Sequence, residues 1–390
     1  MKENSSKIGN KVISIVTPYN GINAGSYWQA YSLMHTLKSM GYSVFFVELS
    51  NTGALKEALS SKKFVSFLKF LNCQSLRETT KSKVPLFRNW FRTTKCNVKK
   101  LRSYLKRFDE YKTAQKIFQI LSKEKATKIS KYIFLGSDTI WNLDSPYYMN
   151  NNKIYWGSFF KENNVASYAV SVANTSFETI KNHSFTKSCL QCMGSISVRD
   201  KHTKEIIKRL TDKTVFQVCD PTMLLEKEDF ISFLVNYAAP KKKFIFLYLF
   251  APLSAPQQTA LKKLAIEKGL TIINGTCCRQ HCDINMLSSP YSFLQHMAYA
   301  EYVITDTFHG NIFSIIFNKN FVCIDRNKNK VTDLLEAFEL LDRKSNDELL
   351  LDLILEKPID YEKPNQIKSK LKADSLDYIS MVLEGKYEQQ

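Results

Sequence analysis

The stretch ITDTFHGNIFSIIF, residues 304–317, joins two apolar segments through a short polar turn. The pattern predicts a buried strand that ends at Asp306 and a helix that begins near Phe308. Thr305 or Thr307 is suited to cap that helix, and an isolated histidine is more often a packing residue than a functional one. The position of His309 favours function here, because it lies in the first turn of a helix at a strand end.

The order of strand, loop and helix recurs along the chain. In the first half the strand patterns fall at residues 11–17, 43–49, 131–136, 165–171, 194–199 and 214–219. In the second half they fall at residues 243–250, 270–274, 301–306 and 321–324. Strands that alternate with helices in this way predict parallel α/β sheets.

The length of the chain favours two such sheets. Because 390 residues exceed what one core usually organises, we expect two Rossmann-like domains. The predicted fold is α/β and GT-B-like, with two parallel sheets that face a central cleft. The first domain would cover residues 1–228 and the second residues 229–390, with the last helix packing back on the first domain.

A strongly basic segment interrupts the first half. Residues 81–131 contain 16 Lys or Arg and three acidic residues, which accounts for most of the net charge of +18. We expect residues 52–130 to form a basic helical insertion, which could be a solvated helical hairpin or could contact an anionic membrane face or an acidic substrate. No nucleic-acid-binding motif accompanies these residues, so nucleic acid is not expected as a partner.

Composition predicts a cytoplasmic protein, peripheral at the inner face of the membrane if the basic segment binds there. The N-terminus has no apolar signal region, and the run FIFLYLFAPL (244–253) is about half of the roughly 20 residues that a membrane helix needs. The nine cysteines follow no disulfide framework. Cys277, Cys278, His281 and Cys282 lack a second half-site, so no metal is expected.

Polar residues follow several predicted strands of the first half. Asp138 stands in GSDTIWN (136–142), where it could bind a hydroxyl, act as a base or cap a helix, while Trp141 could face a sugar or lie in the core. Arg199, in SVRD (197–200), suits a carboxylate or phosphate, although a salt bridge would also explain it. Asp220 precedes Pro221 and indicates first a turn and only second a site.

These motifs together resemble the polysaccharide pyruvyl transferases over roughly residues 11–325. The motifs that carry the resemblance are N-x-G-x-x-x-QAY-x-L (23–33), GSD-x-IWN (136–142), SVRD (197–200), DPT-x-LL (220–225) and VITDTFHGNIFSIIFNK (303–319).

The resemblance implies a transferase that moves the enolpyruvyl unit of phosphoenolpyruvate onto a glycan or its lipid-linked precursor and forms a ketal, without a cofactor or metal. It implies that His309 is catalytic and that Arg199 engages the donor; Asp138 is the candidate base toward the acceptor hydroxyl. The remaining predicted substrate-binding residues are Gly25, Gln29, Ser137, Asn142, Arg279, Asp306, Thr307 and Gly310.

One departure from the family pattern concerns charge. Many members have Arg-Leu-His where this chain has Thr307-Phe308-His309, so another cation must take the role of that arginine. The candidates are Arg279, Arg326, Lys328 and Lys330. Two alternatives to a pyruvyl transferase remain open: a glycosyltransferase of the same fold that uses a nucleotide sugar, and a non-catalytic glycan-binding member of the family.

Overall fold

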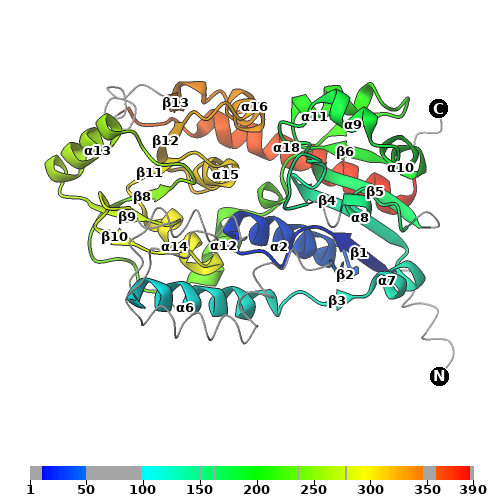
Figure 1. Cartoon of the computed structure of the whole chain (residues 1–390), viewed down its shortest axis with the longest axis horizontal. Coiled ribbons are helices and arrows are strands. Elements are labelled where there is room, and N and C mark those ends of the chain that lie inside the picture. Colours follow the sequence, from blue (N-terminus) through cyan, green and yellow to red (C-terminus); the bar gives the residue numbers. More distant parts are fainter. Residues whose placement is uncertain are drawn as a thin grey trace, which may run out of the picture.

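Apolar runs rich in Val, Ile and Phe form two parallel sheets in the computed structural model of the chain (Figure 1). The structure describes residues 11–49, 98–148, 152–160, 163–235, 237–276, 279–345 and 357–386. Within these residues every strand pair is parallel, as the alternation of strands and helices predicts.

The first sheet has the strand order β3-β2-β1-β4-β5-β6-β7. Its strands are β1 (Val12–Val16), β2 (Ser43–Val47), β3 (Ile120–Leu121), β4 (Tyr132–Asp138), β5 (Asn164–Val170), β6 (Ile196–Val198) and β7 (Val215–Gln217). Its accompanying helices are α2 (Ala24–Ser39), α6 (Val98–Gln115), α7 (Lys123–Ile129), α8 (Asn152–Tyr155), α9 (Phe177–Asn182), α10 (Thr186–Cys192), α11 (Lys201–Lys208) and the 3₁₀ turn η3 (Pro221–Leu224).

The second sheet has the strand order β10-β9-β8-β11-β12-β13. Its strands are β8 (Phe244–Tyr248), β9 (Thr271–Asn274), β10 (Ile284–Asn285), β11 (Tyr302–Thr305), β12 (Asn320–Ile324) and β13 (Lys344–Ser345). The remaining helices are α12 (Lys227–Ile231), η4 (Ser232–Leu234), α13 (Ala255–Glu267), α14 (Pro290–Tyr299), α15 (Phe308–Ile316), α16 (Asn329–Ala337), η5 (Leu341–Arg343) and α18 (Glu362–Glu384).

The basic segment is part of the sheet architecture where the structure describes it. α6 and α7 are helical, as predicted for residues 52–130, but β3 pairs with β2 in the register Phe46↔Ile120, so the expectation of a helical insertion is wrong at residues 120–121. A strand of two residues is too short to leave a periodic signal in the sequence. Residues 52–97, and with them much of the predicted membrane-facing segment 81–131, lie outside the described residues.

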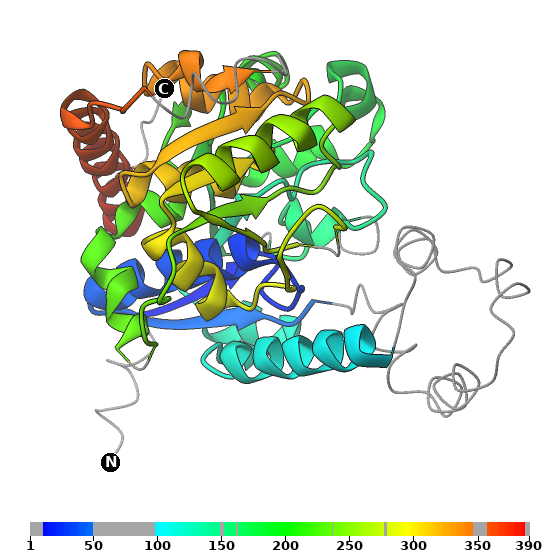
Figure 2. The ribbon, with the colours of Figure 1, turned by 90° about the vertical axis from the view of Figure 1, so that its left-hand side faces the viewer.

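α6 lies along the outside of both halves (Figures 1 and 2). Tyr111 donates its hydroxyl to the carbonyl of Ser288 at 2.9 Å, and Arg107 donates to Ser292 Oγ at 2.8 Å. Both acceptors lie at the beginning of α14 in the second half. Arg107 is therefore a contact between the halves rather than a purely solvated cation.

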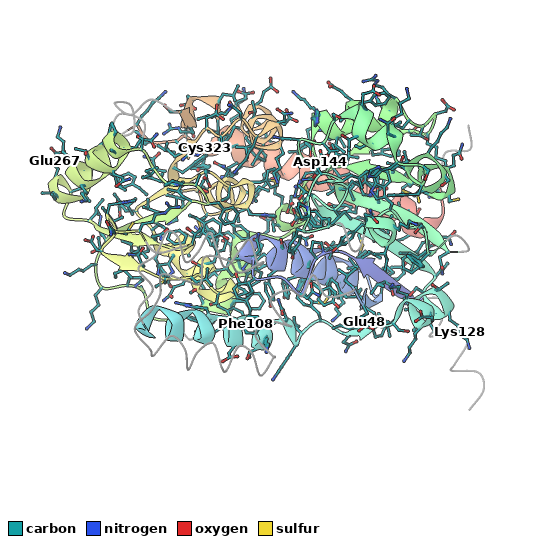
Figure 3. The ribbon with its side chains drawn as sticks, viewed as in Figure 1. Glu48, Phe108, Lys128, Asp144, Glu267 and Cys323 are labelled. Atoms are coloured by element: carbon teal, nitrogen blue, oxygen red, sulfur yellow. The ribbon has the colours of Figure 1, made fainter. Side chains whose placement is uncertain are left out.

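The two halves share one apolar core. A single cluster of buried side chains runs from β1 and α2 through η3 to β8, α14 and α15. Trp28 is fully buried at the junction, where its indole Nε1 donates to the carbonyl of Pro290 at 3.0 Å. Side chains fill the interior of both halves, with Cys323 buried and Glu267 and Lys128 exposed near opposite ends of the molecule (Figure 3).

The last helix connects the two halves. Tyr361, at the beginning of α18, donates its hydroxyl to the carbonyl of Lys319, whereas Tyr378, near its end, donates to the carbonyl of Ser167 at 2.8 Å. α18 thus begins against the second half and ends against the first sheet. The predicted domain boundary at residues 228/229 falls within α12 and stays a prediction. In the described part of the chain, every helix is too short or too polar to cross a bilayer.

Candidate active site

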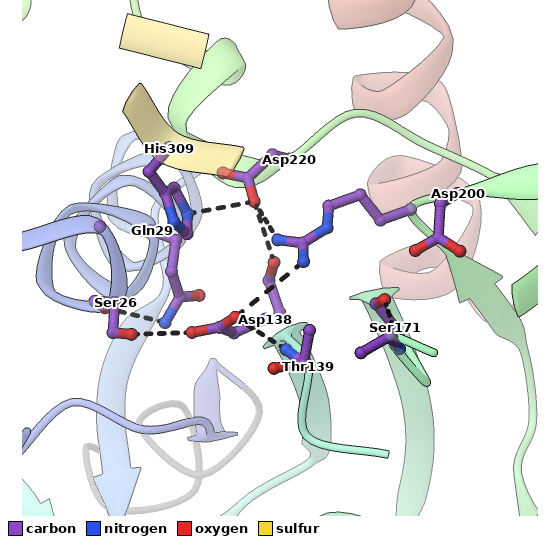
Figure 4. A network of polar contacts seen from close by, with 12 residues as sticks. Ser26, Gln29, Asp138, Thr139, Ser171, Asp200, Asp220 and His309 are labelled. Atoms are coloured by element: carbon purple, nitrogen blue, oxygen red, sulfur yellow. Dashed lines mark hydrogen bonds and ion pairs between the residues drawn. The ribbon is translucent and has the colours of Figure 1, made fainter. Parts of the chain in front are cut away.

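Polar side chains from both halves meet where several strands of the first sheet end (Figure 4). Asp138 ends β4, Arg199 follows β6, and Asp220 follows β7. Parallel strands place their carboxyl ends at the same edge of a sheet, which brings these residues together. Ser26 comes from the first turn of α2, and His309 comes from the first turn of α15 in the second half.

Asp220 is the common acceptor of this cluster. Its Oδ2 accepts a hydrogen bond from Arg199 Nη1 at 2.7 Å and lies 3.6 Å from His309 Nε2. Its Oδ1 accepts from the backbone N–H and the hydroxyl of Thr222. Burial alone would raise the pKa of Asp220, but His309 and Arg199 outweigh it and hold the pKa well below its ordinary value.

Arg199 keeps one edge of its guanidinium without a hydrogen-bond partner among the described residues. Its Nη1 is bound to Asp220, but Nε and Nη2 are buried and have no hydrogen-bond partner among the described residues. Nη2 lies 4.0 Å from Asp138 Oδ1, and the guanidinium carbon lies 4.0 Å from the centre of the Phe308 ring. The Nε and Nη2 N–H groups point from the same edge, which matches the two oxygens of a carboxylate or phosphate.

Asp138 is held in a strained backbone conformation. Its φ is 72°, which non-glycine residues adopt rarely and at a cost of about 1–3 kcal/mol. Its Oδ2 accepts from Ser26 Oγ at 2.7 Å, and its Oδ1 accepts from the backbone N–H of Thr139 at 2.8 Å. Burial raises its pKa, but the nearby His309, Arg199 and Lys330 side chains and the Ser26 hydrogen bond lower it by more, so the carboxylate is the favoured form.

His309 is fixed by the beginning of its helix and by a close glycine. Thr307 caps α15, because its hydroxyl accepts from the backbone N–H of Gly310 at 2.9 Å. A Cβ atom on Gly25 would lie 2.3 Å from His309 Nδ1, so only glycine lets α2 approach the imidazole this closely. Nε2 of His309 has no hydrogen-bond partner among the described residues.

The predicted site residues fall into two groups. His309, Asp138, Arg199 and Ser137 lie in the cluster, with the Ser137 hydroxyl 3.4 Å from Asp220 Oδ2. Gly25, Gln29, Thr307 and Gly310 support it: Gln29 Nε2, for example, donates to the carbonyl of Ser26, and a Cβ on Gly310 would lie 2.0 Å from Thr305 Oγ1.

Three predicted residues are engaged elsewhere. The carboxylate of Asp306 accepts from the backbone N–H groups of Phe250 and Ala251. Arg279 donates to the carbonyls of Leu249 and Ala251, and Asn142 accepts from the hydroxyl of Thr175. Trp141 lies in the core, stacked on Trp156 with ring centres 4.4 Å apart.

Some site residues were not singled out from the sequence. Ser26 and Phe308 carried no separate signal, and Asp220 was interpreted first as a turn residue. The signal for Asp220 was present, since it follows a strand as Asp138 and Arg199 do. Among the described residues no cluster of three His, Cys, Asp or Glu side chains could hold a metal ion; Cys277 and Cys278 lie outside them.

Solved structures with the same architecture include two bacterial proteins. UDP-GlcNAc 2-epimerase from Neisseria meningitidis, bound to UDP-GlcNAc, has a TM-score of 0.51 at 8% identity, over 96% of this chain and 99% of that one. A Listeria monocytogenes protein assigned as a UDP-N-acetylglucosamine 2-epimerase has a TM-score of 0.54 at 8% identity, over 97% and 98%. These similarities confirm the predicted GT-B-like fold and at this identity show the fold alone.

Comparison with curated protein sequences gives no match. The model of the family described as polysaccharide pyruvyl transferase matches residues 23–328, which include α2 with Gly25, the strand ends with Asp138, Arg199 and Asp220, and the helix with His309. The match covers most of the chain, and the chain therefore belongs to the polysaccharide pyruvyl transferase family.

Proposed function

We propose that the protein transfers the enolpyruvyl group of phosphoenolpyruvate to a sugar of a surface polysaccharide or its lipid-linked precursor, and so forms a pyruvate ketal. Family membership makes the chain a transferase that modifies polysaccharide. The donor, the ketal and the residues that act on them are the proposal.

The observation that carries the proposal is the free guanidinium edge of Arg199 beside His309. Both side chains contact Asp220, and the Nε and Nη2 atoms of Arg199 are buried without a hydrogen-bond partner among the described residues. An unsatisfied buried donor costs about 1–3 kcal/mol, which a bound anion would recover. A carboxylate on the Arg199 edge would place the rest of a small donor close to the imidazole.

The residue types fit the proposed chemistry. His309 would give a proton to the methylene carbon of phosphoenolpyruvate, which becomes a methyl group and leaves C2 electron-poor. A sugar hydroxyl would attack C2 and lose its proton to Asp138, whose carboxylate form is available to accept it. A second hydroxyl would then attack C2, the C2–O bond to phosphate would break, and the leaving phosphate would take up the proton of that hydroxyl as the ketal closes.

Asp220 would keep the imidazole oriented and would stabilise its protonated form. The carboxylate lies 3.6 Å from Nε2, and it is itself held by Thr222 and Arg199. Asp220 therefore acts through His309 and Arg199 and has no contact of its own with the reacting atoms in this scheme.

The test is phosphate release from phosphoenolpyruvate in the presence of lipid-linked sugar acceptors, with mass spectrometry of the acceptor. We expect the wild-type chain to add one pyruvylidene unit and His309→Ala to lose this activity by at least about 100-fold, in line with general acid–base catalysis. His35→Ala, at an exposed position of α2, is the control and should retain the activity. Undiminished phosphate release by His309→Ala would exclude the catalytic role.

A further inference from the structure

Two cations approach the same aromatic ring at the candidate site. The guanidinium carbon of Arg199 lies 4.0 Å from the centre of the Phe308 ring, and Lys330 Nζ lies 5.7 Å from it. Arg199 follows β6, Phe308 begins α15, and Lys330 belongs to the first turn of α16. Three separate elements thus converge to hold two positive charges around one ring, an arrangement that cation–π attraction supports.

Lys330 has no anionic partner within the described residues. Its Nζ makes no hydrogen bond and no ion pair there, and it lies 5.7 Å from the centre of the Phe308 ring. Asp138 and Asp200 also face it, but Asp138 accepts from Ser26 and Thr139, and Asp200 Oδ1 accepts from Thr203. Asp138 is therefore already engaged by other donors, whereas Asp200 Oδ2 is buried without a hydrogen-bond partner among the described residues and attracts the ammonium group of Lys330 from beyond ion-pair distance.

Burial and the neighbouring charges determine the pKa of Lys330. Burial lowers its pKa to about 8, and the repulsion of Arg199 and Lys328 adds to this, against the attraction of Asp138 and Asp200. The protonated form is thus less stable here than in water. An anion bound between Arg199 and Lys330 would reverse the imbalance.

The other cations that could replace the family arginine are engaged by the backbone. Arg279 donates to the carbonyls of Leu249 and Ala251, Arg326 donates to the carbonyl of Pro252, and Lys328 donates to the carbonyl of Asp306. Lys330 makes no such bond. It is the cation of this group that shares a ring with Arg199.

We propose that Lys330 is the phosphate-binding residue of the donor site and that Phe308 holds it beside Arg199, so that Arg199 takes the carboxylate and Lys330 takes the phosphate. The assignment rests on the proposed function. In this assignment Lys330 of α16 supplies the positive charge that many family members have at the position of Thr307. Thr307 itself caps α15 in this chain.

The first experiment compares two small anions by calorimetry on the full chain. Lys330→Met keeps the apolar stem and removes the charge. We expect it to weaken the binding of inorganic phosphate at least ten-fold and to leave the binding of pyruvate, which has only a carboxylate, within two-fold. Lys208→Met, at an exposed position of α11, is the control and should leave both affinities within two-fold. Unchanged phosphate affinity in Lys330→Met, or an equal loss for both anions, would overturn the assignment.

A second experiment separates charge from a merely structural role. Sulfate keeps its charge between pH 7 and 10, so a change in its affinity over this range reflects a change in the charge of the protein. The affinity of the wild-type chain should fall as the pH rises above about 8, because Lys330 then loses its proton. Lys330→Arg should bind sulfate and should show no such fall over this range, because arginine stays charged. Identical pH profiles for the two proteins would contradict the proposal.

The outcomes separate this assignment from the proposed function. If phosphate binding depends on Lys330 but no acceptor gains a pyruvylidene unit, the anion site stands and the proposed reaction fails. If the wild-type chain forms the ketal and Lys330→Met does so with unchanged KM for phosphoenolpyruvate and unchanged phosphate affinity, the reaction stands and the role of Lys330 fails.

Discussion

At the scale of single residues, Gly25 shows how closely the site is packed. Asn23 caps α2 by accepting from the backbone N–H groups of Gly25 and Ser26, and this fixes the first turn against α15. The imidazole of His309 then occupies the space that a side chain at position 25 would need. The glycine is required here by a close approach rather than by an unusual φ.

Gly25→Ala should therefore displace His309 and push the beginnings of α2 and α15 apart, because the new Cβ would lie 2.4 Å from the Cγ and 2.7 Å from the Cβ of His309. The new Cβ would lie 2.3 Å from His309 Nδ1, and a displacement on the order of 1 Å at a catalytic group can cost about 100-fold in rate. We expect a loss of phosphate release of at least ten-fold and a loss of about 1–3 kcal/mol in the free energy of unfolding, because the helices must move apart to accommodate the new Cβ.

The matched control for this substitution is Gly21→Ala. Its Cβ would meet the hydroxyl of Tyr147, 2.5 Å away, which is the far end of an exposed side chain and can move at low cost. Full activity in Gly25→Ala would show that the imidazole tolerates the displacement.

At the scale of elements, α18 supports the strand ends that form the site. Ser375 is fully buried in this helix, and its hydroxyl accepts from the backbone N–H of Cys219 at 2.9 Å. Cys219 directly precedes Asp220, so a contact from the far end of the chain fixes the backbone next to the central carboxylate. Lys368 and Lys372 of the same helix bind the carboxylate of Glu226.

Ser375→Ala should lower the free energy of unfolding by about 1–3 kcal/mol, because the buried N–H of Cys219 loses its acceptor. Urea denaturation measures this change. Ser369→Ala, at an exposed position of the same helix, should stay within about 0.5 kcal/mol of the wild-type chain. Equal stabilities for the two variants would mean that water or a shifted carbonyl accepts the hydrogen bond from the backbone N–H of Cys219 in place of Ser375.

At the scale of the whole molecule, Asp220 links the two halves. It follows β7 of the first sheet, pairs with Arg199, which follows β6, and faces His309 of the second half. The shared core and this buried cluster lie at the same junction. Stability and the geometry of the site are therefore coupled, and we expect the chain to unfold in a single transition.

Asp220→Asn should destabilise the chain by about 3–5 kcal/mol at pH 7, because it leaves the buried guanidinium without its counter-charge. The pKa of Asp220 is lowered on folding, so its contribution is complete above the ordinary carboxyl pKa of about 3.9 and is lost as the pH falls below it. Below that pH, the free energy of unfolding of the wild-type chain should fall by up to about 1.4 kcal/mol per pH unit more than that of the variant.

Urea denaturation between pH 7 and pH 2.5 tests this slope. Asp212→Asn, at an exposed position, is the control and should follow the wild-type curve. A slope for Asp220→Asn that equals the wild-type slope would show that other carboxylates carry the acid sensitivity.

The sequence by itself determined the parallel α/β class, the longer strands and the placing of Asp138, Arg199 and His309 at element ends. These depend on local periodicity and on the polar residues that follow apolar runs, both of which are properties of neighbouring positions. The two-residue strands β3, β10 and β13 show no periodicity, and they were found only in the structure.

Only the tertiary structure decided which polar residues share a site. In the sequence Asp220 looks like an ordinary turn residue. Its contacts with Arg199 and His309 exist only because β6, β7 and α15 come together in the fold. In the same way, the sequence offered several cations for the donor phosphate, and packing left Lys330 beside Arg199 while the backbone engaged the others. The physical reason is that pairing of buried charges depends on distances across elements, and a local pattern contains no information about those distances.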